Sequence, residues 1–188
     1  GAAWQKINNV VIPPVEGFKT LTYSGNGSTQ SLTGLGFQPD LVWIKNRNGT
    51  NPHGLWDSVR GAGKLIKSDS SDIQTGNSGD LMGSFDADGF QVNRNYLSFT
   101  AYDNTNWGAG TYVGWSWKSG GNSNTFNKNG TGYATASAAG LTSGSLTPTG
   151  SSINTTTGVS IVTVNSGAST ADVTVSHGLG VKPAFVLF

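Results

Sequence analysis

The chain has 188 residues, a formal net charge of +1 and only 11% charged residues, a balance that provides neither a basic face for nucleic acid nor an acidic tail. It has no cysteine, which excludes a disulfide framework, a thiolate metal site and a cysteine nucleophile. No apolar run approaches the roughly 18–20 residues of a membrane-spanning helix, so we expect no membrane insertion.

Strand signals in the first half are short and bounded by Gly, Asn, Asp or Pro, and no segment has a helical pattern. After the N-terminal residues 1–16, residues 18–24 alternate between apolar and polar side chains and stop at a Gly-Asn-Gly turn. The apolar run 41–45 predicts a strand covered on both faces. The polar segment 46–80 predicts a long loop with one or two short strands, and 83–92 predicts two strands joined at an Asp-Gly turn.

The strand predicted at 111–118 has a period of two. Val113, Trp115 and Trp117 share one face, and we expect these indoles to face the core. Trp43, within the run 41–45, is also expected in the core. These elements predict a β-sandwich of residues 17–118, of the lectin or jelly-roll kind.

Residues 119–157 are almost all small or polar, which fits either a flexible linker or a series of small hairpins. Residues 158–188 then follow the pattern of 17–45, as a partial second copy. The overall prediction is therefore an all-β chain: a sandwich, a hairpin-rich connector and a partial repeat.

The repeat is clearest at a Gly-Leu-Gly motif followed by a proline and an apolar run. Gly34 and Gly36 match Gly178 and Gly180, which predicts the same bend in both copies. The second copy lacks everything equivalent to residues 46–118. Its last strand would be a hydrophobic sheet edge that closes the first sandwich, pairs with a neighbouring subunit or begins a second domain, and we favour the last two. This predicted assembly strand consists of Pro183, Ala184, Phe185, Val186, Leu187 and Phe188.

At these motifs the sequence resembles a domain of uncharacterised function that recurs in structural proteins of tailed phages, especially marine cyanophages, described as tail-fibre-like or virion proteins. The matching stretches span residues 17–188 and include "LGFQPDLVWIKNR", "LWDSVRGAGKLIKSD", "SFDADGFQV", "TYVGWSWK" and "HGLGVKPAFVLF". The resemblance implies a β-sandwich used in a virion, and it supplies no catalytic residues. Thr33 stands in the first copy where His177 stands in the second, so the copies share no histidine role.

The inventory of reactive side chains favours a chain without catalytic residues, metal or cofactor. Glycan hydrolysis needs two paired carboxylates, and the sequence has one Glu and nine Asp, mostly beside turn-forming residues. His53 and His177 are remote from any nucleophile motif. Asp86 and Asp88 are weak candidates for a metal, because a plain Asp-Gly hairpin explains them better. Asp57 and Arg60 are predicted to form a structural ion pair, with ligand contact as the alternative.

A carbohydrate site is the one ligand site that the sequence suggests. The stretch "YDNTNW" combines aromatic rings with amide and carboxylate groups in a predicted loop, and Trp56 lies in another polar loop. The alternative is that both indoles fold back into the core. The candidate residues are Trp56, Tyr102, Asp103, Asn104, Asn106 and Trp107.

From the sequence we expect a non-enzymatic virion structural protein that binds copies of itself and other virion proteins through β-rich interfaces. The alternative is a module that binds glycans of the host surface.

Overall fold

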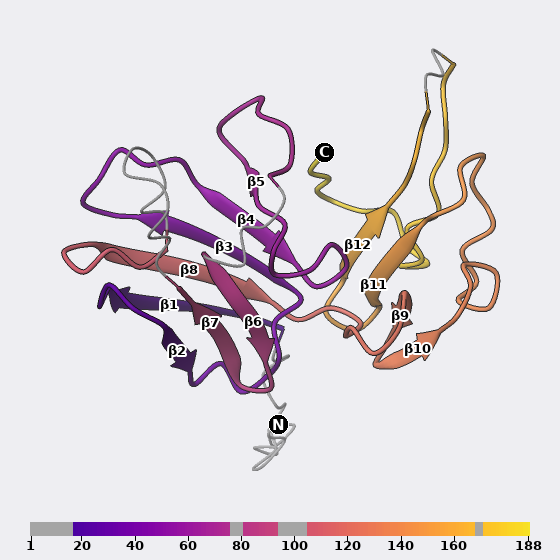
Figure 1. Cartoon of the computed structure of the whole chain (residues 1–188). Helices are drawn as coiled ribbons and strands as arrows, with labels where there is room; N and C mark the ends of the chain where they lie inside the picture. Colours follow the sequence, from indigo (N-terminus) through magenta and orange to yellow (C-terminus); the bar gives the residue numbers. More distant parts are fainter. Residues whose placement is uncertain (1–16, 76–80, 94–104, 168–170) are drawn as a thin grey trace, which may run out of the picture.

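The computed structural model describes residues 17–75, 81–93, 105–167 and 171–188. Within these ranges the chain is all-β, with twelve strands and no helix, as predicted. Two sheets face each other in the first part of the chain, and a third sheet follows beside them (Figure 1).

The larger sheet of the sandwich has five strands in the order β1-β8-β3-β4-β5. These strands are β1 (Phe18–Ser24), β8 (Thr111–Trp117), β3 (Leu41–Asn46), β4 (Gly54–Asp57) and β5 (Ile66–Lys67). All neighbours are antiparallel, and β8 lies between β1 and β3, so the last strand of the sandwich closes onto the first.

The smaller sheet has the order β2-β7-β6, with β2 (Gln30–Thr33), β7 (Gly89–Val92) and β6 (Met82–Asp86). The two-residue loop between β6 and β7 holds Ala87 and Asp88, which confirms the predicted hairpin. A register shift between Met82 and Ser84 places a bulge in β6.

The core of the sandwich lies between these sheets and consists of large apolar side chains from both. Trp56, Phe90, Ile44, Val42 and Tyr112 have no exposed surface. Burial along β3 and β8 alternates strictly, so each of these strands buries one face only. The prediction that residues 41–45 are covered on both faces is therefore wrong.

The inward face of β8 is the opposite of the predicted one. Tyr112, Gly114 and Ser116 face the core, and Val113, Trp115 and Trp117 face outward, half-buried. The cause lies in the facing sheet: a Cβ atom at position 114 would lie 3.2 Å from the Phe90 ring, which fills the space above the glycine. Trp43, opposite Trp115 in the sheet, is likewise half-buried on the outer face and not in the core.

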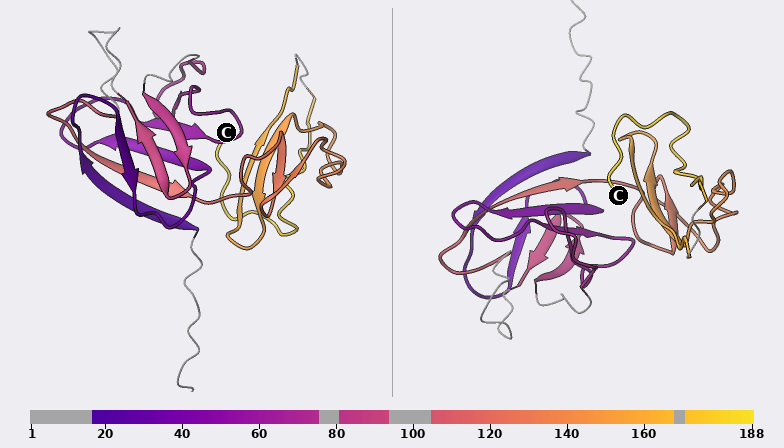
Figure 2. Two further views of the ribbon diagram at one scale, coloured as in Figure 1. Left: turned by 60° about the horizontal axis from the view of Figure 1, so that its bottom comes forward. Right: turned by 90° about the horizontal axis from the view of Figure 1, so that it is seen from above.

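Residues after Lys118 form a second part with its own core. Its sheet has the order β10-β9-β11-β12, and its strands are β9 (Phe126–Lys128), β10 (Thr131–Tyr133), β11 (Gly150–Asn154) and β12 (Val159–Thr163). Its buried cluster is Phe126, Ala136, Ala139, Leu141 and Ile153. Since β11 and β12 form a hairpin, this sheet continues across the predicted division between 157 and 158. The two parts lie side by side, with the C terminus between them (Figure 2).

Candidate functional site: an aromatic groove and a terminal segment

Three indoles gather on the outer face of the five-stranded sheet because their strands are paired in register. Trp43 on β3 is directly opposite Trp115 on β8, and Trp117 follows two residues later on the same face. The rings of Trp43 and Trp115 meet edge to face, with centroids 5.9 Å apart. Together with His53 these side chains line an open groove of about 320 Å³, the aromatic groove.

Two contacts set the ends of the aromatic groove. Trp43 Nε1 donates a hydrogen bond of 3.0 Å to His53 Nδ1, so this nitrogen carries no proton and the imidazole is held against the indole. At the other end, the Phe18 ring on β1 lies 5.0 Å from the Trp117 ring. A row of aromatic rings therefore crosses the three strands β1, β8 and β3 and ends at His53, just before β4. The faces of these rings can stack on the apolar face of a flat ligand ring.

The predicted carbohydrate residues do not form this groove. Trp56 has no exposed surface, because its ring packs over Gly54 in the sandwich core, so it cannot stack on a sugar. Asn106 is buried, and its amide joins the 105–107 segment to the turn at Asn26 and Ser28. Trp107 keeps 41% of its surface exposed. Tyr102, Asp103 and Asn104 lie outside the described residues.

The weak metal candidates have structural partners. Asp86 Oδ1 accepts a hydrogen bond of 2.7 Å from Ser84 Oγ. Asp88 binds the first Gly-Leu-Gly motif, since Gly34 N donates to its Oδ2 at 3.0 Å and Gly36 N to its Oδ1 at 2.6 Å. No cluster of three metal-ligating side chains occurs among the described residues.

The ion pair predicted in the "WDSVRG" turn is confirmed. Arg60 Nε lies 2.5 Å from Asp57 Oδ2, and Asp57 Oδ1 also accepts from the amides of Val59 and Arg60. The carboxylate therefore closes a tight turn after β4, which is a structural role.

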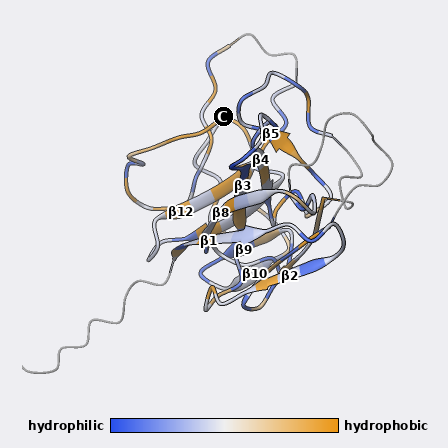
Figure 3. Cartoon of the chain, turned by 90° about the vertical axis from the view of Figure 1, so that its left-hand side faces the viewer, coloured by the Kyte–Doolittle hydropathy of each residue, from blue (hydrophilic) through white to orange (hydrophobic). Residues whose placement is uncertain are grey.

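The predicted assembly strand is not a strand in the described chain. The last residues have no ladder partner and are exposed, with 78% of Phe185, 54% of Val186 and 51% of Leu187 accessible. Figure 3 shows this apolar stretch in orange beside the C terminus. In the first copy the equivalent residues form β3, which is protected because it lies between β8 and β4.

The comparisons with known proteins give a family. A family model described as a domain of unknown function, DUF7483, matches residues 13–188. The chain belongs to the DUF7483 family. No curated protein and no solved structure matches it. Membership of DUF7483 brings no assigned activity, ligand or partner. In the described ranges no helix is long and apolar enough to cross a membrane.

Sequence reasoning missed the aromatic groove, although the signal was present. The period of two places Trp115 and Trp117 on one face, and the register of β3 and β8 in the structure brings Trp43 opposite Trp115. The sequence does not show whether that face points into the core or outward.

Proposed function

We propose that this DUF7483 chain is a non-enzymatic structural protein that assembles with itself and with other proteins through β-rich interfaces. Its resemblance to phage virion domains favours a place in a virion. The observation that carries the proposal is the exposed apolar segment 181–188. Of the described residues that line the aromatic groove, none is a carboxylate, which also favours binding over hydrolysis.

The proposal follows from comparing the two copies. Aligned on their glycines, residues 185–188 correspond to Leu41–Ile44. In the first copy, Val42 and Ile44 have no exposed surface, because the facing sheet covers them. In the second copy Val186, which corresponds to Val42, is 54% exposed. An exposed apolar segment of strand-forming residues is stabilised when it adds to the edge of another sheet.

The test is the oligomeric state of the full chain. We expect size-exclusion chromatography with light scattering to show a concentration-dependent assembly that Phe185→Asp weakens. Ile73→Asp is the matched control, because Ile73 is also apolar and is 88% exposed on the loop after β5. A monodisperse monomer at high protein concentration would contradict the proposal.

A second candidate function, glycan binding, is favoured by the aromatic groove. Indole faces on a sheet surface can stack on the apolar face of a pyranose ring, and a His53 nitrogen is available as a polar group at the edge. On a glycan array we expect binding that is lost on Trp115→Ala and kept on Trp107→Ala, which removes an exposed indole outside the groove. Equal loss in both variants would exclude the groove as the site.

A further inference from the structure

Both glycines of the second Gly-Leu-Gly motif have positive φ angles, as in the first motif. The φ angles are 94° at Gly34 and 81° at Gly36, and they are 68° at Gly178 and 77° at Gly180. All four lie in the left-handed region that favours glycine. Successive backbone amides in such a bend can converge on one anion.

In the first copy the anion is a side chain of the β6–β7 hairpin. Asp88 accepts from the Gly34 and Gly36 amides through its two carboxylate oxygens, and its backbone carbonyl accepts from Leu35 N at 3.1 Å. Three amides of the motif are thereby satisfied by one residue. These amide contacts hold the pKa of Asp88 below its ordinary value, with Gly36 contributing most.

In the second copy only the middle amide has a partner among the described residues. Leu179 N donates to His177 Nδ1 at 3.3 Å, so the imidazole takes the place of the hairpin carbonyl. Within the described part of the chain, neither Gly178 N nor Gly180 N donates a hydrogen bond. The loop therefore has the glycine φ angles of the first motif, without an anionic partner from the described part of this chain.

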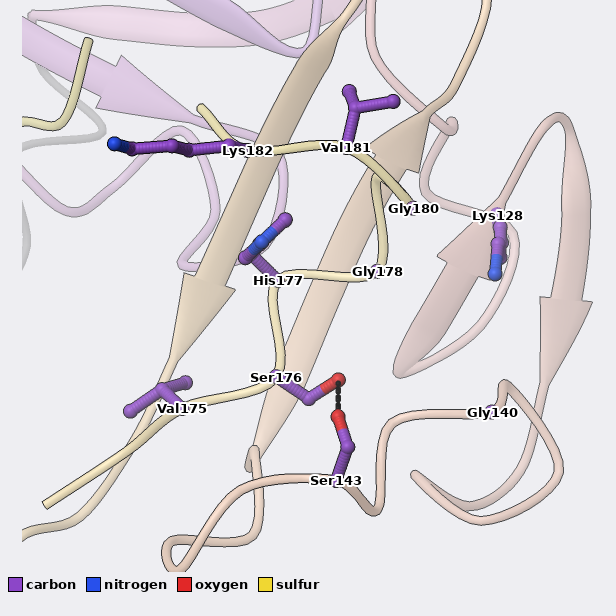
Figure 4. A pocket seen from close by; sticks show the side chains of 10 residues that line it. All are labelled: Lys128, Gly140, Ser143, Val175, Ser176, His177, Gly178, Gly180, Val181 and Lys182. Carbon is purple, nitrogen blue, oxygen red and sulfur yellow. Dashed lines mark hydrogen bonds between the residues drawn. The ribbon is translucent and has the colours of Figure 1, made fainter. Parts of the chain in front are cut away.

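The surroundings suit a carboxylate. Gly178 and Gly180 line an open pocket of about 470 Å³, and none of its described lining residues is acidic. Figure 4 shows Lys128 on β9 across the pocket from the loop, with the Lys182 side chain extending away from it. Neither lysine forms an ion pair with a described residue.

We propose that the Gly178 and Gly180 amides bind an aspartate side chain of a second polypeptide, presented at a β-hairpin turn as Asp88 is presented to the first motif. This inference deepens the proposed assembly function, because it names the chemistry of the partner. Asp88 of another copy of this chain is already bound to its own motif, so the aspartate comes from a different hairpin.

The experiment is an NMR titration of the full ¹⁵N-labelled chain. The probe is a cyclised peptide with the sequence of residues 82–92, which carries the Asp88 turn. We expect the amide proton signals of Gly178 and Gly180 to shift downfield and to saturate. The signals of Gly130 and Gly158 should stay in place, because these glycines also have positive φ but donate to the carbonyls of Gly120 and Asn154.

Controls identify the chemistry of the ligand. The same peptide with Asp88→Asn should bind several-fold more weakly. Lys128→Glu in the protein should weaken the peptide several-fold at low salt, and Lys64→Glu, outside the pocket lining, should leave binding unchanged. Sodium acetate tests the carboxylate alone. Shifts with acetate but none with the peptide would show a site for a free anion only, and would overturn the proposal.

The proposal would also be overturned if the Gly178 and Gly180 amide signals did not shift with the peptide, or if they shifted equally with the Asp88→Asn peptide. The titration reads single amides and light scattering reads the assembly. If the chain self-associates but the Gly178 and Gly180 amide signals do not shift with the peptide, this inference alone is contradicted. A monomer whose amides bind the peptide would contradict the proposed self-assembly alone.

Discussion

Two tryptophans of the sandwich show how position decides the contribution of the same side chain. Trp56 on β4 has no exposed surface and packs in the core, whereas Trp115 on β8 is half-buried on the outer face. Their free energies of burial should therefore differ clearly.

We expect Trp56→Ala to lower the free energy of unfolding by about 3–5 kcal/mol, since it leaves a large cavity in the core. Trp115→Ala should lower the free energy of unfolding by clearly less, because Trp115 is only half-buried. Urea denaturation followed by circular dichroism measures both. Equal losses would mean that the outer face of β8 is covered as fully as the core.

The carboxylate of Asp88 makes stability depend on pH. Hydrogen bonds from the Gly36 and Gly34 amides, and the nearby Lys19 ammonium, lower its pKa in the folded chain. A lowered pKa contributes stability above the unfolded pKa, and this contribution is lost as pH falls through the folded pKa.

Asp88→Asn should accordingly lower the melting temperature at pH 7, and the difference from the unsubstituted chain should shrink as pH falls below about 3.9, the ordinary aspartate pKa. Thermal unfolding followed by circular dichroism over a pH series measures it. A difference that stays constant with pH would show that the carboxylate charge has no role at the first motif.

At the scale of elements, one buried aspartate joins the sandwich to the second part. Asp40, just before β3, is 1% exposed. Its Oδ2 accepts from Ser119 N at 2.7 Å and from Gly121 N at 3.2 Å, and its Oδ1 accepts from Ser58 Oγ. The segment that leaves β8 is thus attached to the start of β3.

Asp40→Ala should destabilise the chain by about 1–3 kcal/mol for each amide left buried without a partner. We also expect faster proteolytic cleavage near residues 118–121. Ser58→Ala is the matched control, because it removes one donor to Asp40 and leaves the Ser119 and Gly121 amides bonded. If both variants were cleaved equally fast, the amide contacts would not be what joins the parts.

At the scale of the whole molecule, the two parts have separate cores and the last residues belong to neither. The sandwich is centred on Trp56 and Phe90, and the second sheet on Leu141 and Ile153. Residues 181–188 have no ladder bonds to any other described residue that would slow the exchange of their amides.

We expect hydrogen exchange to be slowest in β3 and β8, which have neighbours on both sides, and fast at 181–188 in dilute protein. At concentrations where the chain assembles, the amides of 181–188 should become protected. Mass spectrometry of labelled peptides measures both. Assembly without protection of this segment would place the interface elsewhere.

The sequence by itself determined the all-β class, the positions of β1, β3 and β8, the hairpin at Asp88 and the matched bends at the four glycines. These features are local: alternation, turn residues and positive φ are properties of a few neighbouring residues. The tertiary structure alone decided which face of β8 is inside, because Phe90 from the other sheet fills the space over Gly114. It likewise buried Trp56 and paired β12 with β11. Burial depends on what the facing layer supplies, and a period of two defines two faces without saying which one a distant strand will cover.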